Sequence, residues 1–296
     1  MGAMAPKNKL DSPYRTRFAP SPTGALHFGS LVAALGSYLR ARSFQGQWLI
    51  RIEDIDPPRQ VAGAIEAQLT TLADFGLKSD LPVVRQSTRL AAHRAAIAKL
   101  VDQGLAYPCG CSSKELPKDA PYPQTCRHGL PPGRVERSIR LKTHDEVVVF
   151  EDAVQGPQEQ IPSQQSGDFI IRRGDGLIAY QLAVVVDDHA QQITEVVRGA
   201  DLMDSVGRQC LVYDALHYPR PEYLHLPLIV DHNGRKLSKS DGADPIARYN
   251  RNEAFRLALR ALGHEPPPEA ISLDAQWQWA LKNWALHRIP RGPVPI

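Results

Sequence analysis

Short apolar runs typical of β-strands alternate with helical patterns over the first hundred residues of this chain. Residues 14–18 form the first such run, and apolar side chains recur at helical spacing over residues 26–42. Residues 47–52 predict a second strand, and residues 88–103 predict a later helix that ends at Gly104. Because strands separated by helices cross over to pair in parallel, this order predicts an α/β fold with a doubly wound parallel sheet.

The amino-acid composition is that of an ordinary globular protein. With 296 residues, 43% hydrophobic and 23% charged, the chain is long enough for one large or two modest globular domains. No apolar run approaches the ~20 residues that span a bilayer, and the N-terminus lacks a secretory apolar core. We therefore expect a cytoplasmic protein without a membrane partner, most simply a monomer. The net charge of +3 permits an RNA partner without requiring one.

Two short segments carry the chemistry expected of a nucleotide-activating enzyme. Near the start, the segment Ala-Pro-Ser-Pro-Thr-Gly-Ala-Leu-His-Phe-Gly-Ser (19–30) leads into the first predicted helix, whose N-terminus suits a polyphosphate. Near the end, Lys-Leu-Ser-Lys-Ser (236–240) forms a basic loop after residues 226–230, which predict a strand. We expect His27 beside a bound polyphosphate, and Lys236 and Lys239 to supply positive charge as a phosphate group leaves.

Three of the four cysteines lie within an 18-residue window. Cys109, Cys111 and Cys126 supply three thiolates, and a tetrahedral Zn²⁺ site needs a fourth donor. Tyr122 and His128 are the two candidates; histidine is the commoner zinc ligand, although His128 is only two residues from Cys126. The alternative is a loop of three reduced thiols with no metal.

The two chemical segments resemble the HIGH and KMSKS signatures of class I aminoacyl-tRNA synthetases. Arg-Phe-Ala-Pro-Ser-Pro-Thr-Gly (17–24) is similar to the glutamyl and glutaminyl branch in particular. The resemblance implies a Rossmann-type class I synthetase fold with a zinc-bearing insertion and a short helical C-terminal tail. It also implies four segments: the first Rossmann half (1–106), the insertion (107–190), the second half with the lysine loop (191–245) and the tail (246–296).

The resemblance also implies residue roles. Arg198 would hold the side-chain carboxylate of glutamate, Glu53 would receive its ammonium, and Tyr180 would help to position it. ATP, bound with Mg²⁺, would contact His27, Gly29, Ser30 and Lys239. The short members of the branch share the pattern Cys-x-Cys followed by Tyr-x-x-x-Cys, so the resemblance implies Tyr122 as the fourth ligand of a structural Zn²⁺. The full set implied for glutamate comprises Arg17, Phe18, Ala19, Pro20, Ser21, Glu53, Tyr180 and Arg198.

The tail decides among members of this branch. Only 56 residues follow Ser240, too few for the anticodon-binding domains of an ordinary glutamyl-tRNA synthetase. The chain thus resembles the glutamyl-Q tRNA(Asp) synthetases, which use ATP to activate L-glutamate and transfer it to the queuosine base in the anticodon stem-loop of tRNA(Asp). Two alternatives stay open: a minimal glutamyl-tRNA synthetase that charges a 3′ end, and an inactive synthetase-like binding protein.

One acidic cluster remains outside these assignments. Asp187, Asp188 and His189 follow an apolar stretch that ends at Val186. No step of the chemistry above needs this trio, and we predict a solvated or helix-capping role for it.

Overall fold

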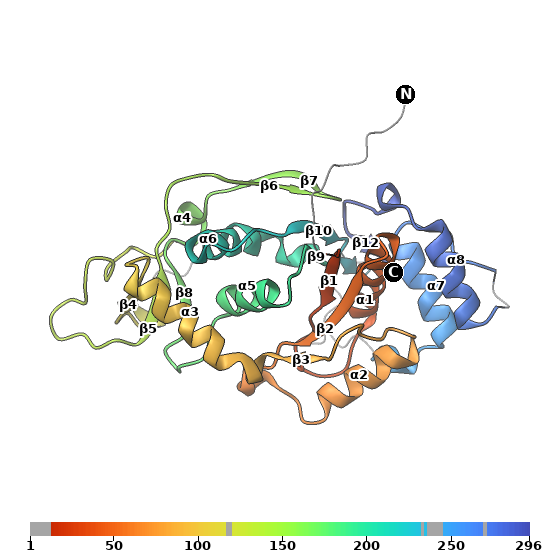
Figure 1. Cartoon of the computed structure of the whole chain (residues 1–296), viewed down its shortest axis with the longest axis horizontal. Helices are drawn as coiled ribbons and strands as arrows, with labels where there is room; N and C mark the ends of the chain where they lie inside the picture. Colours follow the sequence, from red (N-terminus) through yellow and green to blue (C-terminus); the bar gives the residue numbers. More distant parts are fainter. Residues whose placement is uncertain (1–12, 117–119, 232–233, 236–244, 269–270) are drawn as a thin grey trace.

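Parallel strands from two distant parts of the chain form the centre of the molecule (Figure 1). The computed structural model describes residues 13–116, 120–231, 234–235, 245–268 and 271–296. One parallel sheet has the order β1 (Arg15–Phe18), β2 (Gln47–Ile52), β3 (Val84–Arg85). The other has the order β7 (Gly156–Gln160), β6 (Val148–Asp152), β10 (Glu222–Leu226), β9 (Glu195–Gly199), with only β7 antiparallel.

The two sheets meet at β1 and β9. The backbone N–H of Thr194 donates to the carbonyl of Arg15 at 2.9 Å, so these strands lie side by side. The chain winds outward from this junction in both directions, through β2 and β3 on one side and through β10 on the other. The doubly wound arrangement is thereby confirmed, and ligands of such folds bind outside the carboxyl ends of the strands at the junction.

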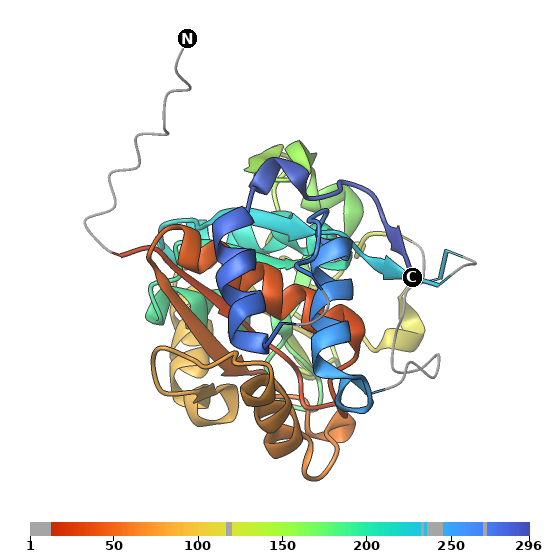
Figure 2. The same cartoon turned by 90° about the vertical axis from the view of Figure 1, so that its right-hand side faces the viewer.

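Helix α1 (Phe28–Ser43) connects β1 to β2 and carries the main core. Leu31, Leu35 and Leu39 lie at helical spacing and are at most 2% exposed, which explains why this segment folds as a buried helix. Helices α7 (Arg251–Ala261) and α8 (Leu273–Asn283) cover α1 (Figure 2). Helix α2 (Ala64–Asp74) completes this half of the protein.

The insertion lies at the opposite end of the molecule from α7 and α8 (Figure 1). Its antiparallel sheet has the order β4 (Ala106–Cys109), β5 (Ser138–Leu141), β8 (Phe169–Arg172). Helices α3 (Leu90–Asp102), α5 (Tyr180–Ala190) and α6 (Val206–Leu216) form a second apolar core with this sheet. Apart from short 3₁₀ turns, the described residues also form the short helix α4 (Pro162–Gln165) and the strand pair β11 (Ile229–Val230) and β12 (Val294–Pro295).

One detail differs from expectation, and one prediction falls where the structure gives no description. The strand predicted over residues 226–230 is divided: β10 ends at Leu226, β11 begins at Ile229, and Pro227, which has no N–H to donate, lies between them. Lys236 and Lys239 lie outside the described residues.

Among the described residues, no helix combines the length and the apolar character that crossing a membrane requires.

Candidate active site

A cleft of about 760 Å³ opens where β1, β9 and the first turn of α1 meet. It lies at the carboxyl ends of β1 and β9, as expected for the junction of a doubly wound sheet. Every described residue predicted to contact glutamate or ATP lines this one cleft: Arg17, Phe18, Ala19, Pro20, Ser21, His27, Gly29, Ser30, Glu53, Tyr180 and Arg198.

His27 is the N-cap of α1. Its Nδ1 accepts a hydrogen bond from the backbone N–H of Ser30 at 3.3 Å, which leaves the proton of a neutral imidazole on Nε2. Gly29 keeps the space beside the imidazole open, because a Cβ at residue 29 would lie 3.1 Å from Cε1 of His27 and the ring would have to shift. The positive end of the α1 dipole and an imidazole N–H therefore meet at one side of the cleft.

Hydrogen bonds hold the loop between β1 and α1 against its neighbours. The backbone N–H of Glu53 donates to the carbonyl of Pro20 at 2.9 Å. The side-chain amide of Gln68 donates to the carbonyls of Ser21 and Gly24 at 3.0 and 2.7 Å. Gly24 has a φ of 124°, which side chains disfavour, so the turn requires a glycine here. This loop places Ser21 and Glu53 on one wall of the cleft.

Arg198, on β9, is a buried arginine with an incomplete set of partners. It is 5% exposed, and its Nη1 and Nη2 donate to the hydroxyl of Tyr180 and to the carbonyl of Leu202, each at 3.2 Å. Within the described part of the chain, no carboxylate lies within ion-pair distance of this guanidinium. A buried cation that lines a cleft without a protein counter-ion is suited to an anionic ligand.

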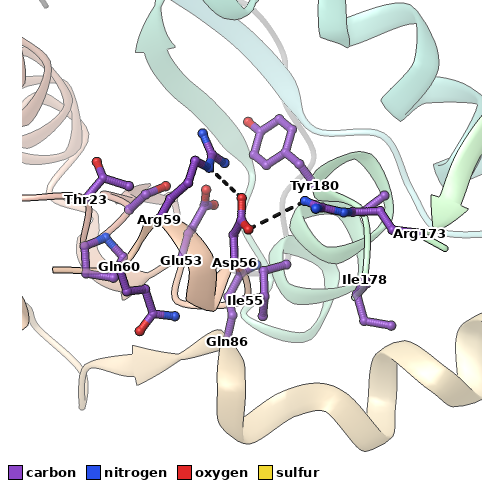
Figure 3. Close-up of a pocket in the computed structure, with 13 residues that line it drawn as sticks. Thr23, Glu53, Ile55, Asp56, Arg59, Gln60, Gln86, Arg173, Ile178 and Tyr180 are labelled. Carbon is purple, nitrogen blue, oxygen red and sulfur yellow. Dashed lines mark hydrogen bonds and ion pairs between the residues drawn. The ribbon is translucent and has the colours of Figure 1, made fainter. Parts of the chain in front are cut away.

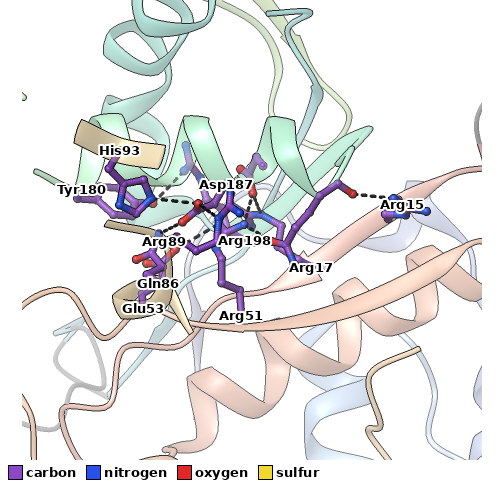
Figure 4. A network of polar contacts seen from close by, with 12 residues as sticks. Arg15, Arg17, Arg51, Glu53, Gln86, Arg89, His93, Tyr180, Asp187 and Arg198 are labelled. Carbon is purple, nitrogen blue, oxygen red and sulfur yellow. Dashed lines mark hydrogen bonds and ion pairs between the residues drawn. The ribbon is translucent and has the colours of Figure 1, made fainter. Parts of the chain in front are cut away.

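Arg17 and Arg51, in contrast, share one buried carboxylate, that of Asp188. Figure 4 shows both arginines within this network of polar contacts. Asp188 accepts from Nε of Arg17 at 2.9 Å and from Nη1 of Arg51 at 2.6 Å. Burial opposes ionisation of Asp188, but the two guanidinium groups outweigh it and lower the pKa of this carboxyl. Arg51 also contacts Glu53 at 3.4 Å. Burial raises the pKa of Glu53, and the charges of Arg51 and Arg17 oppose this rise.

Asp187 belongs to a second set of polar contacts on the same helix, α5. Its carboxylate accepts from Gln86 at 2.9 Å and from Arg89 at 2.7 Å, and it lies 3.0 Å from Nε2 of His93. Asp187 and Asp188 are 0% and 2% exposed. The prediction of a solvated or helix-capping role is therefore wrong for Asp187 and Asp188, because both carboxylates are buried and bound by other side chains. The third member of the trio, His189, is exposed at the end of α5, as a solvated role requires.

Sequence reasoning missed Arg51, although a signal existed. Arg51 is the one charged residue in the apolar strand Gln-Trp-Leu-Ile-Arg-Ile, and its side chain is 0% exposed. A charge within a strand that is buried on both faces requires a buried partner. An arginine within such an apolar run is therefore itself a sequence signal for a buried polar network.

A smaller cavity of about 160 Å³ adjoins the cleft and shares Glu53 and Tyr180 with it (Figure 3). Asp56 lies between two arginines there: Nε of Arg59 is 2.5 Å and Nη1 of Arg173 is 3.6 Å from its carboxylate oxygens. Arg59 follows β2 of the parallel sheet, whereas Arg173 follows β8 of the antiparallel sheet. Segments that follow two different sheets therefore both contribute side chains to the cavity.

The cysteine cluster of the insertion has the arrangement of a metal site. The Sγ atoms of Cys109, Cys111 and Cys126 all lie within 4.8 Å of one another, and those of Cys111 and Cys126 are 3.7 Å apart. The hydroxyl of Tyr122 lies 3.3 Å from Sγ of Cys109 and 3.6 Å from Sγ of Cys111. His128 is exposed and is not part of this cluster.

Electrostatics favour a thiolate at Cys109, whereas burial raises the pKa of Cys111. Burial raises the pKa of Cys109, but hydrogen bonds from Tyr122, the backbone of Cys111 and Arg140 lower it to about 7 overall. Nε of Arg140 lies 3.3 Å from Sγ of Cys109, and its guanidinium stacks over the ring of Tyr122 at 3.8 Å. The donor set of three buried sulfurs and one phenol oxygen fits Zn²⁺, because thiolates at ~2.3 Å from a tetrahedral ion are ~3.8 Å apart.

Fold and cleft define a class I aminoacyl-tRNA synthetase catalytic domain. The family described as "tRNA synthetases class I (E and Q), catalytic domain" matches residues 13–124 and 132–262. The crystal structure of a glutamate-tRNA synthetase from Elizabethkingia anophelis has a TM-score of 0.80 and 26% identity, covering 96% of this chain and 68% of that one. A glutamate tRNA ligase from Elizabethkingia meningosepticum, in complex with its amino acid, has a TM-score of 0.81 and 26% identity, covering 96% and 67%.

Sequence relatives identify a narrower group. A glutamyl-Q tRNA(Asp) synthetase of Chromobacterium violaceum is 48% identical over 290 residues, which cover 96% of this chain and 97% of the relative. One from Xanthomonas axonopodis pv. citri is 50% identical over 282 residues, covering 94% and 93%. The chain belongs to the glutamyl-Q tRNA(Asp) synthetase family within the class I synthetases of the E and Q type.

Proposed function

We propose that this protein activates L-glutamate with ATP and transfers it to the queuosine base in the anticodon of tRNA(Asp). In the first step an oxygen of the α-carboxylate attacks the α-phosphorus of ATP. The bond between the α-phosphorus and the oxygen that bridges the α- and β-phosphates breaks, and pyrophosphate leaves. In the second step a hydroxyl of queuosine attacks the activated carbonyl, and AMP leaves. Family membership supports both steps.

The environment of Arg198 is the observation that supports glutamate as the amino-acid substrate. Its buried guanidinium lines the cleft without a carboxylate partner among the described residues, so the side-chain carboxylate of glutamate supplies the missing charge. Glu53 lines the same cleft and serves the ammonium, while the hydroxyl of Tyr180 restricts the position of Arg198. Arg17 contributes through the shape and positive potential of the wall, since Asp188 already binds its guanidinium.

ATP is proposed to bind at the first turn of α1. His27, Gly29 and Ser30 line the cleft there, and a helix N-terminus with an imidazole N–H stabilises charge on phosphate oxygens. Lys236 and Lys239 are proposed to neutralise the leaving pyrophosphate together with Mg²⁺; both lie outside the described residues.

The cysteine cluster is proposed to hold one structural Zn²⁺ through Cys109, Cys111, Cys126 and Tyr122. The sulfur separation of 3.7 Å and the position of the Tyr122 hydroxyl support this ligand set over one with His128. The buried cluster belongs to the insertion and is absent from the lining of the cleft, so the ion would stabilise the insertion and take no part in the reaction.

Glutamate-dependent exchange of pyrophosphate into ATP tests the activation step. Exchange is expected with glutamate and much more weakly with glutamine or aspartate, with tRNA present in a parallel set of reactions. For the acceptor, nuclease digestion of tRNA labelled with glutamate is expected to release the label on the queuosine nucleoside. A label on the 3′-terminal adenosine would contradict the proposed transfer.

A further inference from the structure

A buried histidine connects Arg198 to an aspartate that the activation chemistry does not use. His225 pairs directly with Arg198 across β10 and β9, and Tyr223 pairs with Asp152 across β10 and β6. The strand register therefore places Arg198, His225 and Asp152 on three adjacent strands. Nε of Arg198 donates to Nε2 of His225 at 3.0 Å, and Nδ1 of His225 lies 2.6 Å from Oδ2 of Asp152.

Asp152 is held as an ionised acceptor. It is 1% exposed, and its Oδ1 accepts from the backbone N–H groups of Val154, Gln155 and His225 at 3.0, 2.8 and 3.2 Å. Burial opposes ionisation, but the hydrogen bonds from His225 and from the backbone outweigh it and lower the pKa of this carboxyl. Because Oδ1 is occupied by backbone donors, Oδ2 is directed at the imidazole.

The carboxylate determines which nitrogen of His225 carries the proton. Asp152 accepts, so Nδ1 of His225 must be the donor, and Nε2 then offers its lone pair to Arg198. Burial lowers the pKa of His225, and the charge of Arg198 assists, although Asp152 opposes this shift. The neutral Nδ1–H tautomer is the one form of the ring that satisfies both contacts.

The count of N–H groups on Arg198 shows what this arrangement achieves. A guanidinium has five N–H groups. In the described structure His225, Tyr180 and Leu202 accept one each, from Nε, Nη1 and Nη2 in turn. One N–H then remains on each terminal nitrogen, and these two N–H groups are available to donate to the two oxygens of a carboxylate. Rotation of the guanidinium would break all three protein contacts.

We propose that His225 and Asp152 are positioning residues that orient the guanidinium of Arg198 for the side-chain carboxylate of the amino-acid substrate. The proposal rests on the function proposed above. His225 fixes the plane of the guanidinium, and Asp152 fixes the tautomer of His225. Neither residue lines the cleft, so their effect reaches the substrate through Arg198 alone.

A matched pair of variants separates this role from simple packing. In His225→Asn the amide reaches the Nδ1 position and keeps the contact with Asp152, but nothing reaches Nε of Arg198. In His225→Gln the side-chain oxygen reaches the Nε2 position and accepts from Arg198. We expect His225→Asn to raise the KM for glutamate about 10- to 100-fold, with the KM for ATP unchanged, and His225→Gln to recover most of this loss.

Asp152→Asn tests the tautomer. The amide of Asn donates to Nδ1, which moves the imidazole proton to Nε2 and points two donors, of His225 and Arg198, at each other. The KM for glutamate is again expected to rise, with the KM for ATP unchanged. His264→Asn is the control, because His264 is also a buried, hydrogen-bonded histidine but lies outside the cleft. Its thermal stability is expected to fall without a change in either KM.

The outcomes distinguish this inference from the proposed function. Wild-type protein without glutamate-dependent pyrophosphate exchange would overturn the proposed function, and the positioning role with it. Suppose that the wild type exchanges pyrophosphate, but the KM for glutamate of His225→Asn and of Asp152→Asn lies within twofold of the wild-type KM. This result would overturn the positioning role alone. A parallel rise of both KM values, matched by His264→Asn, would show a general loss of structure and would also overturn it.

Discussion

Replacing Arg198 by lysine tests the proposed glutamate site at its centre. Lysine keeps the positive charge but presents it as a point, and it has no equivalent of the guanidinium Nε–H. The variant therefore loses the two-pronged contact with a carboxylate, and also the bond to His225 at 3.0 Å and that to Tyr180 at 3.2 Å. We expect selective weakening of glutamate binding and little change in ATP binding.

The size of the effect follows from the lost contacts. A hydrogen bond to a charged group contributes about 1.5–3 kcal/mol, and lysine retains about one of the two that Arg198 would offer a carboxylate. The loss of the other corresponds to a roughly 10- to 150-fold rise in the KM for glutamate. Arg198→Ala removes the charge as well and is expected to exceed this range.

Steady-state pyrophosphate exchange, with glutamate and ATP varied in turn, measures both constants. Arg40→Lys is the matched control: Arg40 makes a two-pronged pair with Glu195 at 2.8 and 2.7 Å, and it does not line the cleft. This control is expected to lose stability while keeping both KM values. The reasoning is refuted if Arg198→Lys changes the KM for glutamate by less than threefold, or raises both KM values equally.

Three further changes test other parts of the site. Gly29→Ala places a methyl group 3.1 Å from Cε1 of His27, so kcat for exchange is expected to fall about tenfold while the KM for glutamate is kept; an unchanged kcat would argue against the role of His27. Cys126→Ser is expected to reduce the zinc content, measured by elemental analysis, from one ion per chain to near zero and to lower the Tm by ~5 °C. A zinc content equal to that of the wild type would contradict the proposed zinc site. Asp188→Asn should cost about 3–5 kcal/mol of unfolding free energy near neutral pH, because two buried guanidinium groups lose their counter-ion. The pKa of Asp188 is lower in the folded than in the unfolded protein. The difference in unfolding free energy between the wild type and the variant is therefore largest above the unfolded pKa of about 3.9 and decreases as the pH falls below it. Urea titrations at several pH values measure this dependence.

The sequence predicted which residues line the site, but not which residues form ion pairs with one another inside it. The resemblance of residues 17–24 to the glutamyl and glutaminyl branch implied a place for Arg17 in the glutamate pocket, and Arg17 lines the cleft. Its partner Asp188, however, is 171 residues away, and the contact arises from the packing of α5 beside β1. No pattern of local spacing encodes such a pair, because it depends on how two elements meet in three dimensions.

The insertion shows the same limit. Cysteine spacing indicated a metal site but could not choose between Tyr122 and His128, because side-chain direction in a loop depends on its path. In the folded chain, Arg140 stacks on the ring of Tyr122, and the hydroxyl of Tyr122 accepts from the backbone N–H of Cys126 at 3.1 Å. These contacts hold the phenol among the sulfurs, whereas His128 lies at the surface.

His225 and Asp152 were also missed, for a related reason. Each is a polar residue at or near the end of a strand, and alone such a residue has many ordinary explanations. Only the order of β9, β10 and β6 brings them into line behind Arg198.

Transfer of labelled glutamate to tRNA is the most direct test of the account as a whole. Wild-type protein, ATP and radiolabelled glutamate are incubated with tRNA(Asp) that carries queuosine and with the same tRNA carrying guanosine at that position. The account predicts labelling of the queuosine form alone. Equal labelling of both tRNAs would contradict it, because the acceptor would then be a group that the two share.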